Sequence, residues 1–369
     1  MVYRTAFTQP NDWLGDVEIG MDLAFRIIPF VDDSKEVIMC RKHVCVFVVG
    51  LLLIGAGLGF AEGQQEVPVE PEEELEFFVV THGGAADPFW AVVVRGAEDA
   101  AEQFGVDVTY LGPEQYDVGE FVDMIETAVE ADPDGIAVTI TDQSAVEPPL
   151  LEAIERDIPV VAINVPDDRG PMERIPYLTY VGADEYQVGV QAANRMLQEF
   201  GNETPERGVV LIHEPGHAGH EARSAGMEDV FSEEGIPFER LSGSPDAANN
   251  FEALDAYLRA NPETDAVFTL GPLGAHPALS LMNDLGDDAD DIRLGAVDLS
   301  DEIISAIQDG RMVFTIEQQQ YLQGYLPIGL MTLYNQFGLI PREPILTGPA
   351  IVDEDNVDIV EEMVGEGYR

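Results

Sequence analysis

The chain has 369 residues, of which 70 are acidic and 18 are basic, so its formal net charge is −52. With 46% hydrophobic and 8% aromatic residues, it carries enough apolar side chains for folded cores and is not a disordered acidic chain. Its charge excludes a protein that binds nucleic acid or anionic lipid, because both partners need a basic surface. The length predicts two or three domains.

The few basic residues are unevenly distributed. Lysine occurs only as Lys35 and Lys42, and beyond residue 61 the bases are 13 arginines against 63 acids. At molar salt the Debye length falls to about 3 Å, which screens the repulsion between surface acids. The composition therefore favours a halophilic protein. The alternative is an ordinary acidic protein that works outside the cytoplasm.

An apolar run over residues 44–60 follows the basic segment Arg41-Lys42-His43 and ends at Ala61. These are the parts of a secretory signal peptide, and the run is short for a transmembrane span, which needs about 20 residues. We expect a signal peptide over 39–61, cleavage near Ala61, and a periplasmic or extracellular protein.

The segments on either side of the expected signal peptide are interpreted from it. Residues 62–75 are rich in proline and glutamate and predict a disordered acidic linker. We expect residues 1–38 to be an over-extended gene start, or else a cytoplasmic leader on an uncleaved anchor. Cys40 and Cys45 are the only cysteines and precede the expected cleavage, so the mature protein has no disulfide or cysteine site.

The remaining chain alternates short apolar runs with amphipathic stretches, which is typical of βαβ units around a parallel sheet. The expected strands cover 77–81, 106–110, 135–139, 159–164, 208–213, 266–270, 293–297 and 313–316. Apolar residues at helical spacing predict helices over 89–104, 185–200 and 322–337. The fold class is therefore α/β.

A weak internal repeat suggests two similar lobes. The segments FFVVTH (77–82) and VVLIHE (209–214) each end a strand at or next to a histidine and open a series of strand–helix units. In doubly wound sheets, ligands bind beyond the carboxyl ends of the strands. Polar residues at those ends are therefore candidates for function, among them Asp142, Asn164, Glu214 and Asp298.

The segment Asp87-Pro88-Phe89-Trp90 follows the first expected strand. Aspartate suits the cap position of a helix, and proline suits its first turn. Phe89 and Trp90 are about 100° apart on a helix, so both cannot face the same core. At least one is expected to face a cleft, where it can stack on a sugar ring, and the alternative is that both serve only packing.

Residues 213–217, His-Glu-Pro-Gly-His, match the zinc-protease pattern HExxH, and His220 follows. That pattern needs a continuous helix, which Pro215 and Gly216 break. A hydrolase using His213, His217 and His220 is therefore only an alternative, as is adventitious metal binding. The favoured interpretation is a loop at the mouth of a cleft, with Glu214 as a hydrogen-bond acceptor.

Three further residues are candidates for binding hydroxyl groups. Arg223 lies on the helix after the histidine loop and either forms a surface salt bridge or holds a ligand with its forked donors. Asp298 ends an apolar strand and binds ligand or caps the next helix. Gln318 opens an amide trio whose groups both donate and accept hydrogen bonds. Nothing in the sequence assembles a catalytic triad or a phosphate loop.

Over residues 75–352 the chain resembles the periplasmic sugar-binding proteins of ABC importers, of the ribose/galactose-binding type that is related to LacI-like effector domains. The resemblance is carried, in the family's order, by the segments 86–108, 134–164, 180–189, 213–229, 294–307 and 314–330. It implies a type 1 periplasmic binding protein, in which two Rossmann-like lobes with parallel sheets are joined by three crossing strands. The implied lobes are 76–184 plus 319–345, and 185–318 plus 346–369.

The resemblance also implies roles for single residues. The family's aromatic pair falls on Phe89 and Trp90, the polar residue before it on Asp87, and later contacts on Arg223, Asp298 and Gln318. Two positions depart from the family: Asn164 stands where an acid is usual, and Gly271 where an asparagine is usual. These departures leave the identity of the sugar open.

The expected function is capture of a monosaccharide and its delivery to the permease of an ABC importer, by a monomer that is not an enzyme and carries no cofactor or metal. The first alternative is a sugar or nucleoside sensor that feeds a chemoreceptor or sensor kinase. The second is the hydrolase at the histidine loop. A repressor is excluded by the acidic charge and by the absence of a DNA-binding helix pair from the sequence.

Overall fold

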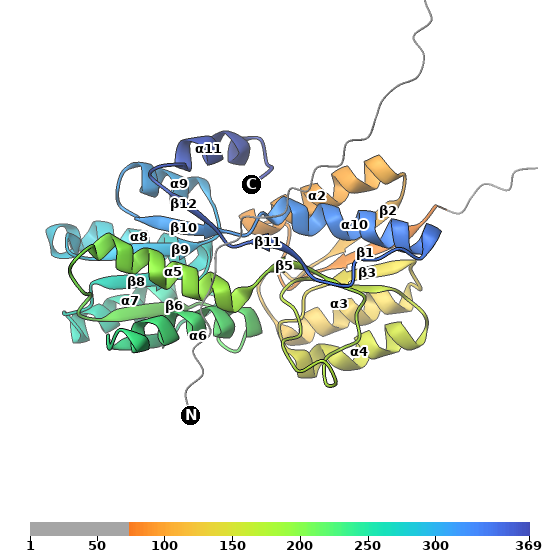
Figure 1. Ribbon diagram of the computed structural model, residues 1–369, viewed down its shortest axis with the longest axis horizontal. Helices are drawn as coiled ribbons and strands as arrows, with labels where there is room; N and C mark the ends of the chain where they lie inside the picture. The colour runs from red at the N-terminus through yellow and green to blue at the C-terminus, as the bar shows by residue number, and fades with distance from the viewer. Residues whose placement is uncertain (1–73) are drawn as a thin grey trace, which may run out of the picture. The chain divides into compact units, whose positions relative to one another are not determined.

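A computed structural model describes residues 74–369, which form two α/β lobes, each built on a six-stranded sheet (Figure 1). The expected leader and signal peptide, and all but the end of the expected linker, lie outside the described residues. Among the helices of residues 74–369, none combines the length and the apolar character that crossing a bilayer requires.

The first lobe contains the sheet with strand order β11-β5-β4-β3-β1-β2, in which every neighbouring pair is parallel. Its elements are β1 (Glu76–Val80), α2 (Pro88–Phe104), β2 (Asp107–Leu111), α3 (Val118–Glu130), β3 (Gly135–Val138), α4 (Gln143–Glu155), β4 (Val160–Asn164), β5 (Tyr180–Ala183), α10 (Gln320–Phe337) and β11 (Ile345–Gly348).

The second lobe contains the sheet β12-β10-β9-β8-β6-β7, which is parallel except where β12 runs antiparallel to β10. Its elements are α5 (Glu185–Phe200), β6 (Gly208–Ile212), α6 (Ala218–Glu233), β7 (Phe238–Ser242), α7 (Ala247–Ala260), β8 (Ala266–Thr269), α8 (Pro272–Leu285), the 3₁₀ turn η1 (Gly286–Ala289), β9 (Arg293–Val297), α9 (Asp301–Gln308), β10 (Phe314–Glu317), β12 (Ala350–Asp353) and α11 (Val357–Gly365).

The chain passes between the lobes three times. The passages run from β5 to α5, from β10 to α10, and from β11 to β12, where the last falls between Gly348 and Ala350. Residues 346–348 therefore pair in the first sheet, although the expected boundary assigned them to the second lobe. The α/β class with two parallel-dominated sheets is as the sequence predicted.

Each sheet is covered by helices on both faces. Successive residues of a strand point to opposite faces, and in these strands the residues on both faces are apolar. In β1, Phe77 and Val79 pack with residues of α2 and α10, whereas Phe78 and Val80 pack with residues of α3 and α4. Figure 1 shows α10, near the C-terminus, lying beside α2, near the start of the described chain.

The two main helix pairs approach closely through glycine. A Cβ added to Gly324 of α10 would lie 1.9 Å from the carbonyl oxygen of Val93 in α2, and one added to Gly189 of α5 would lie 1.9 Å from that of Arg223 in α6. Real Cβ atoms never come this near to a carbonyl oxygen. A glycine contact therefore allows one helix pair in each lobe to pack closely. In the second lobe this contact is made with the backbone of Arg223 and so positions that residue.

Aspartate caps five helices, so part of the acidity serves local structure. In each case a side-chain oxygen accepts a hydrogen bond from a backbone N–H of the first turn, which satisfies a group that the helix leaves free. The capping residues are Asp87, Asp117, Asp142, Asp184 and Asp246.

Candidate functional site

A polar cavity of about 70 Å³ lies between the two lobes, at the carboxyl ends of the strands of both sheets. Eight of the nine residues predicted to bind a ligand line it: Asp87, Phe89, Trp90, Asn164, Glu214, Arg223, Asp298 and Gln318. The other lining residues include four histidines and the start of α8. The structure thus brings together side chains that are up to 236 positions apart in the sequence, from His82 to Gln318.

Asp142 is the exception and does not line the cavity. It caps α4, and its Oδ1 accepts a hydrogen bond from the backbone N–H of Ala145 at 3.1 Å. The carboxylate is therefore directed back to its own helix. Asp87 also caps a helix, with Oδ1 2.8 Å from the N–H of Phe89, but it lines the cavity as well, and burial raises its pKa.

Both aromatic residues of α2 face the cavity. Phe89 and Trp90 are 5% and 6% exposed, and their rings meet edge to face with centroids 4.8 Å apart. Trp90 also meets the ring of His82 edge to face, at 4.8 Å. Both rings therefore line the cavity and also pack on each other. They supply an apolar wall for the lobe-1 side of the pocket.

Asn164 and Asp298 occupy equivalent places in the two lobes. Asn164 is the last residue of β4 and Asp298 directly follows β9, and each of these strands lies beside the strand that leads into a crossing, β5 and β10. Both residues have a left-handed backbone, with φ of 59° and 69°, a conformation in which asparagine and aspartate are several-fold enriched. The carbonyl of Asn164 accepts from the hydroxyl of Tyr180, and that of Asp298 from Thr315. This turn directs each side chain into the cavity.

The amide of Gln318 is fully buried at the crossing from β10 to α10. Its Nε2 donates to Oδ1 of Asp298 at 2.5 Å, while its Oε1 has no hydrogen-bond partner among the described residues. Burial raises the pKa of Asp298 to about 7. Gln318 therefore offers an acceptor, and Asp298 offers either a donor or an acceptor near neutral pH.

Arg223 forms a two-pronged ion pair with Glu185, the first residue of α5. Its Nε donates to Oε2 of Glu185 and its Nη2 donates to Oε1 at 3.1 Å, and its Nη1 donates to the carbonyl of Leu270 at 3.0 Å. Burial alone would lower the pKa of Arg223, but the carboxylates of Glu185 and Asp298 raise it. Arg223 is thus a buried cation, not a surface salt bridge.

The segment that matches HExxH is not helical. His213 and Glu214 follow β6, Gly216 has a φ of 87°, and His217 is the cap of α6. The two imidazoles are therefore not presented from one helix face, as the zinc-protease pattern requires. Burial and nearby acids, chiefly Asp87, raise the pKa of Glu214 to about 8, so its carboxyl group holds a proton at neutral pH.

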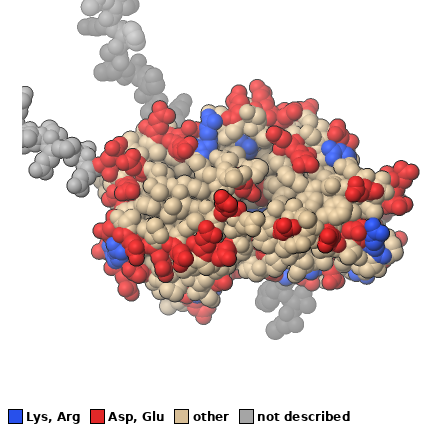
Figure 2. Space-filling model, turned by 180° about the vertical axis from the view of Figure 1, so that it is seen from behind, with Lys and Arg blue, Asp and Glu red and all other residues tan. Residues whose placement is uncertain are grey.

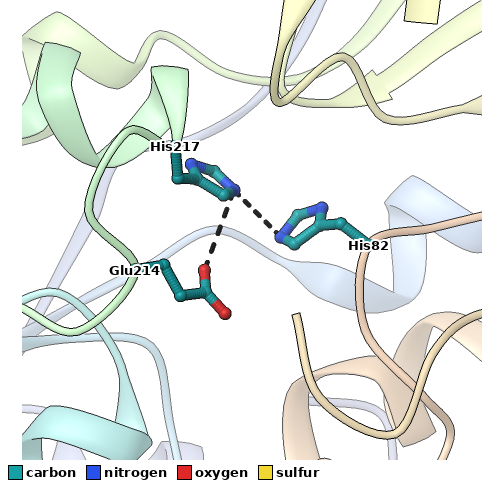
Figure 3. Close-up of side chains that lie close together, drawn as sticks. All are labelled: His82, Glu214 and His217. Carbon is teal, nitrogen blue, oxygen red and sulfur yellow. Dashed lines mark hydrogen bonds and ion pairs between the residues drawn. The ribbon is translucent and has the colours of Figure 1, made fainter. Parts of the chain in front are cut away.

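The four histidines of the cavity come from both lobes. His82 follows β1, and its Nε2 lies 3.0 Å from Nε2 of His217 in the other lobe; Glu214 lies beside this pair (Figure 3). Burial lowers the pKa of His82 and His213 to about 3, and those of His217 and His220 well below the usual value. All four rings are therefore neutral at pH 7.

The cavity is narrow because this histidine contact spans it. Pockets for small molecules are usually about 300–1,000 Å³, so the cavity with His82 and His217 in contact is smaller than such pockets. Next to them, a Cβ on Gly271 would lie 3.1 Å from Cε1 of His213. The absent side chain at residue 271 thus leaves the room that the ring of His213 takes.

Two residues of the site were not among the predicted ligand contacts. Glu185 looked like an ordinary acid in the first turn of a helix, and its pairing with Arg223 joins positions 38 apart. His82 carried a usable signal, since it follows an apolar strand that is the equivalent of the strand before His213. Polar residues just beyond such strands are the ones that line the cavity.

Two α/β lobes, three crossings and a polar cavity between the lobes define the class of two-lobed ligand-binding proteins. A model of the periplasmic binding protein domain matches residues 77–337, and the chain belongs to this family. This confirms the resemblance to the sugar-binding proteins of ABC importers.

Individual relatives agree with the family assignment. A xylose/arabinose-binding protein, XylF, from Sulfolobus acidocaldarius is 28% identical over 75% of this chain and 69% of its own length. A periplasmic sugar-binding protein from Legionella pneumophila has 29% identity and a TM-score of 0.69, covering 74% of this chain and all of its own. A carbohydrate transporter protein from Acidothermus cellulolyticus, solved with myo-inositol, has 28% identity and a TM-score of 0.73 over 80% of this chain and all of its own.

Proposed function

We propose that this protein captures a monosaccharide between its two lobes, outside the cytoplasm, and delivers it to an ABC importer. The observation that carries the proposal is the convergence of Phe89 and Trp90 from one lobe with Arg223, Asp298 and Gln318 at the other side of one cavity. Aromatic rings stack on the C–H face of a sugar, and charged and amide groups bind its hydroxyls.

The energetics of such binding are adequate. Micromolar affinity requires about 8 kcal/mol, and hydrogen bonds to charged groups contribute about 1.5–3 kcal/mol each when shielded from water. Asp298 and Gln318 each leave polar atoms free for a ligand, and Arg223 is held rigidly by Glu185. Fixed donors and acceptors lose little entropy on binding, so a few of them suffice.

Closure is expected to accompany binding. The lobes turn about the three crossings, and the sugar stabilises the closed arrangement because only there does it touch both lobes. Asn164 donates to Gln323 at 3.1 Å, and Gln323 donates in turn to the carbonyl of Gln318 at 3.1 Å and to Thr347 at 3.2 Å. This amide chain joins the pocket to two of the crossings.

Titration calorimetry tests the binding role directly. The protein, with a chelator present, is titrated with ribose, xylose, arabinose, galactose, glucose, fructose and inositol. One saturable response of one ligand per chain, at micromolar affinity, is expected. Silence across the panel from protein that circular dichroism shows to be folded would overturn the monosaccharide proposal.

Two variants locate the binding. Phe89→Ala removes part of the apolar wall and is expected to weaken binding at least tenfold. Asp298→Asn keeps the acceptor for Gln318 but removes the ionisable group, and a smaller loss is expected. Phe337→Ala is the matched control, because this ring at the end of α10 is 66% exposed and outside the cavity. Equal effects of the two phenylalanine variants would place the ligand elsewhere.

Delivery is tested in cells. Uptake of the labelled sugar is expected to disappear when the gene is deleted and to return when it is restored, but not with the Phe89→Ala variant. Unchanged uptake together with lost chemotaxis or lost gene induction would favour the sensor function.

We propose further that the protein acts as a monomer.

We also propose that the protein works in concentrated salt. Acidic residues are spread over the surface with few arginines between them, as one face of the molecule illustrates (Figure 2). Together with the net charge of −52, this surface needs screening to remain compact. In this proposal, the acidic residues that neither contact the ligand nor cap a helix keep the protein soluble in salt.

A further inference from the structure

Four of the six histidines of the chain meet in the cavity. The ring centroids of His82 and His217 are 4.5 Å apart, those of His217 and His220 are 4.4 Å apart, and those of His213 and His220 are 4.5 Å apart. Sugar hydroxyls need donors and acceptors, but they do not require four imidazoles in mutual contact. The clustering therefore indicates a second kind of ligand, one that imidazole nitrogens bind well.

A carboxyl group lies among these rings. Oε2 of Glu214 is 4.0 Å from Nε2 of His217 and 3.7 Å from Nε2 of His220. His82, Glu214 and His217 each offer one ligand atom, and these three atoms lie within 4.8 Å of one another. In Figure 3 the two rings and the carboxylate face a common space between the lobes.

The hydrogen bonds of the two facing rings assign their protons. Nδ1 of His217 accepts from the backbone N–H of His220 at 3.2 Å, so the proton of this ring is on Nε2 and is donated to Nε2 of His82. The proton of His82 is therefore on Nδ1 and is donated to the hydroxyl of Thr139 at 3.0 Å. The lone pair of His82 Nε2 thus faces the cleft, where it accepts the hydrogen bond from His217, while the other ring nitrogen is held by Thr139, as in a metal-binding histidine.

We propose that Nε2 of His82, Nε2 of His217 and the carboxylate of Glu214 bind one divalent transition-metal ion of the Zn²⁺ type, which joins the two lobes. Imidazole nitrogen and carboxylate oxygen are common zinc ligands, and three protein ligands leave one position open. The site goes beyond sugar capture and does not depend on it.

The geometry requires only small movements. Ligand atoms around a tetrahedral zinc ion are about 3.3 Å apart, given bond lengths of about 2.0–2.1 Å, against 3.0 Å between the two nitrogens and 4.0 Å from His217 to Glu214. The ion takes the place of the proton between the rings. That proton moves to Nδ1 of His217, which gives up its cap hydrogen bond, and the proton of Glu214 passes to solvent.

A second set, His213, Glu214 and His220, shares the same carboxylate. It lies within one lobe, and Nδ1 of both rings has no hydrogen-bond partner among residues 74–369. No hydrogen bond to Nδ1 therefore holds those rings, whereas Thr139 holds Nδ1 of His82. This difference favours the set that spans the lobes.

The test titrates Zn²⁺ into the metal-free, sugar-free whole chain in an excess of Mg²⁺. Mg²⁺ prefers oxygen ligands and occupies sites made of carboxylates alone. One ion per chain at micromolar affinity or tighter is expected. His82→Ala is expected to weaken binding at least about tenfold, and Thr139→Val by a smaller factor, because it releases the ring without removing it. His276→Ala, which removes a histidine outside the cluster, should change nothing.

A second measurement reports on the bridge between the lobes. Zn²⁺ is expected to reduce the radius of gyration in solution scattering for the parent and for His276→Ala, but not for His82→Ala. Tight binding that survives His82→Ala would place the ion at His213 and His220 and overturn the proposal. Absence of saturable binding, from protein that still binds sugar in chelator, would overturn it while leaving the transport role intact.

Discussion

Arg223 and Glu185 form a buried ion pair that joins α6 to the start of α5, directly beside the point where the chain leaves the first lobe. Both side chains are only 4% exposed, so water cannot solvate either charge if the other is removed. The pair with Glu185 holds the side chain of Arg223 in a fixed position in the cavity wall.

Removal of one partner should therefore be costly. Arg223→Met leaves Glu185 buried and unpaired, and we expect a loss of about 3–5 kcal/mol in the free energy of unfolding. Adding Glu185→Leu should restore most of it, as measured by urea denaturation. Arg259→Met is the control, because the pair of Arg259 with Asp255 is exposed and should contribute less than about 1 kcal/mol. No recovery in the double variant would contradict this account.

The glycine contact between α5 and α6 should be equally sensitive. In Gly189→Ala the new Cβ meets the carbonyl of Arg223, so the helices must separate, and we expect a loss of about 1–3 kcal/mol despite the better helix propensity of alanine. Sugar affinity should fall too, since Arg223 moves with its helix. Gly170→Ala, where nothing lies within 4 Å of the added Cβ, should be neutral in both thermal unfolding and calorimetry.

The pH dependence of stability should change in Asp298→Asn. The carboxyl of Asp298 has a pKa of about 7 when folded, above its unfolded value of 3.8, so the folded state holds this proton more tightly. The parent therefore loses stability relative to the variant as pH rises through the window from about 4 to 7. Equal stabilities are expected at pH 4, with the variant ahead at pH 8 by at most about 4 kcal/mol. A difference that is the same at both pH values would contradict the raised pKa.

Salt should stabilise the protein far beyond the usual range. With a net charge of −52 the folded chain repels itself, and the screening length falls from about 10 Å at 0.1 M to about 3 Å at 1 M. We expect the melting temperature to rise steadily with KCl into the molar range, as followed by circular dichroism. A melting temperature that is flat or falls above 0.1 M would favour the ordinary acidic protein.

Most of the fold follows from local patterns. All eight expected strands and all three expected helices are present, because buried parallel strands are continuous apolar runs and their helices carry apolar stripes. The strands that were missed are β5, β7, β11 and β12. Of these, β7, β11 and β12 are edge strands, and the sequence FERLS of β7 has mostly polar residues that neither form an apolar run nor alternate strictly, so the strand signal is lost.

The site could be predicted only as far as strand ends reveal it. Asn164 and Asp298 stand out as polar residues after apolar strands, and both reach the cavity. Asp142 has the same sequence context, but its carboxylate caps a helix instead. Which of these two roles a residue takes depends on the direction of one turn, and contacts between distant positions, such as Arg223 with Glu185, leave no local trace.

The passage of the chain between the lobes has a consequence for the order in which the protein can be made. The helix α10 and strand β11, which complete the first lobe, are translated after the whole of the second sheet except β12. Until they emerge, the face of β1 that carries Phe77 and Val79 lacks the cover of Ile328 and Met331. A chain that ends before residue 348 therefore lacks a finished first lobe, which the protein completes only in the last twentieth or so of its synthesis.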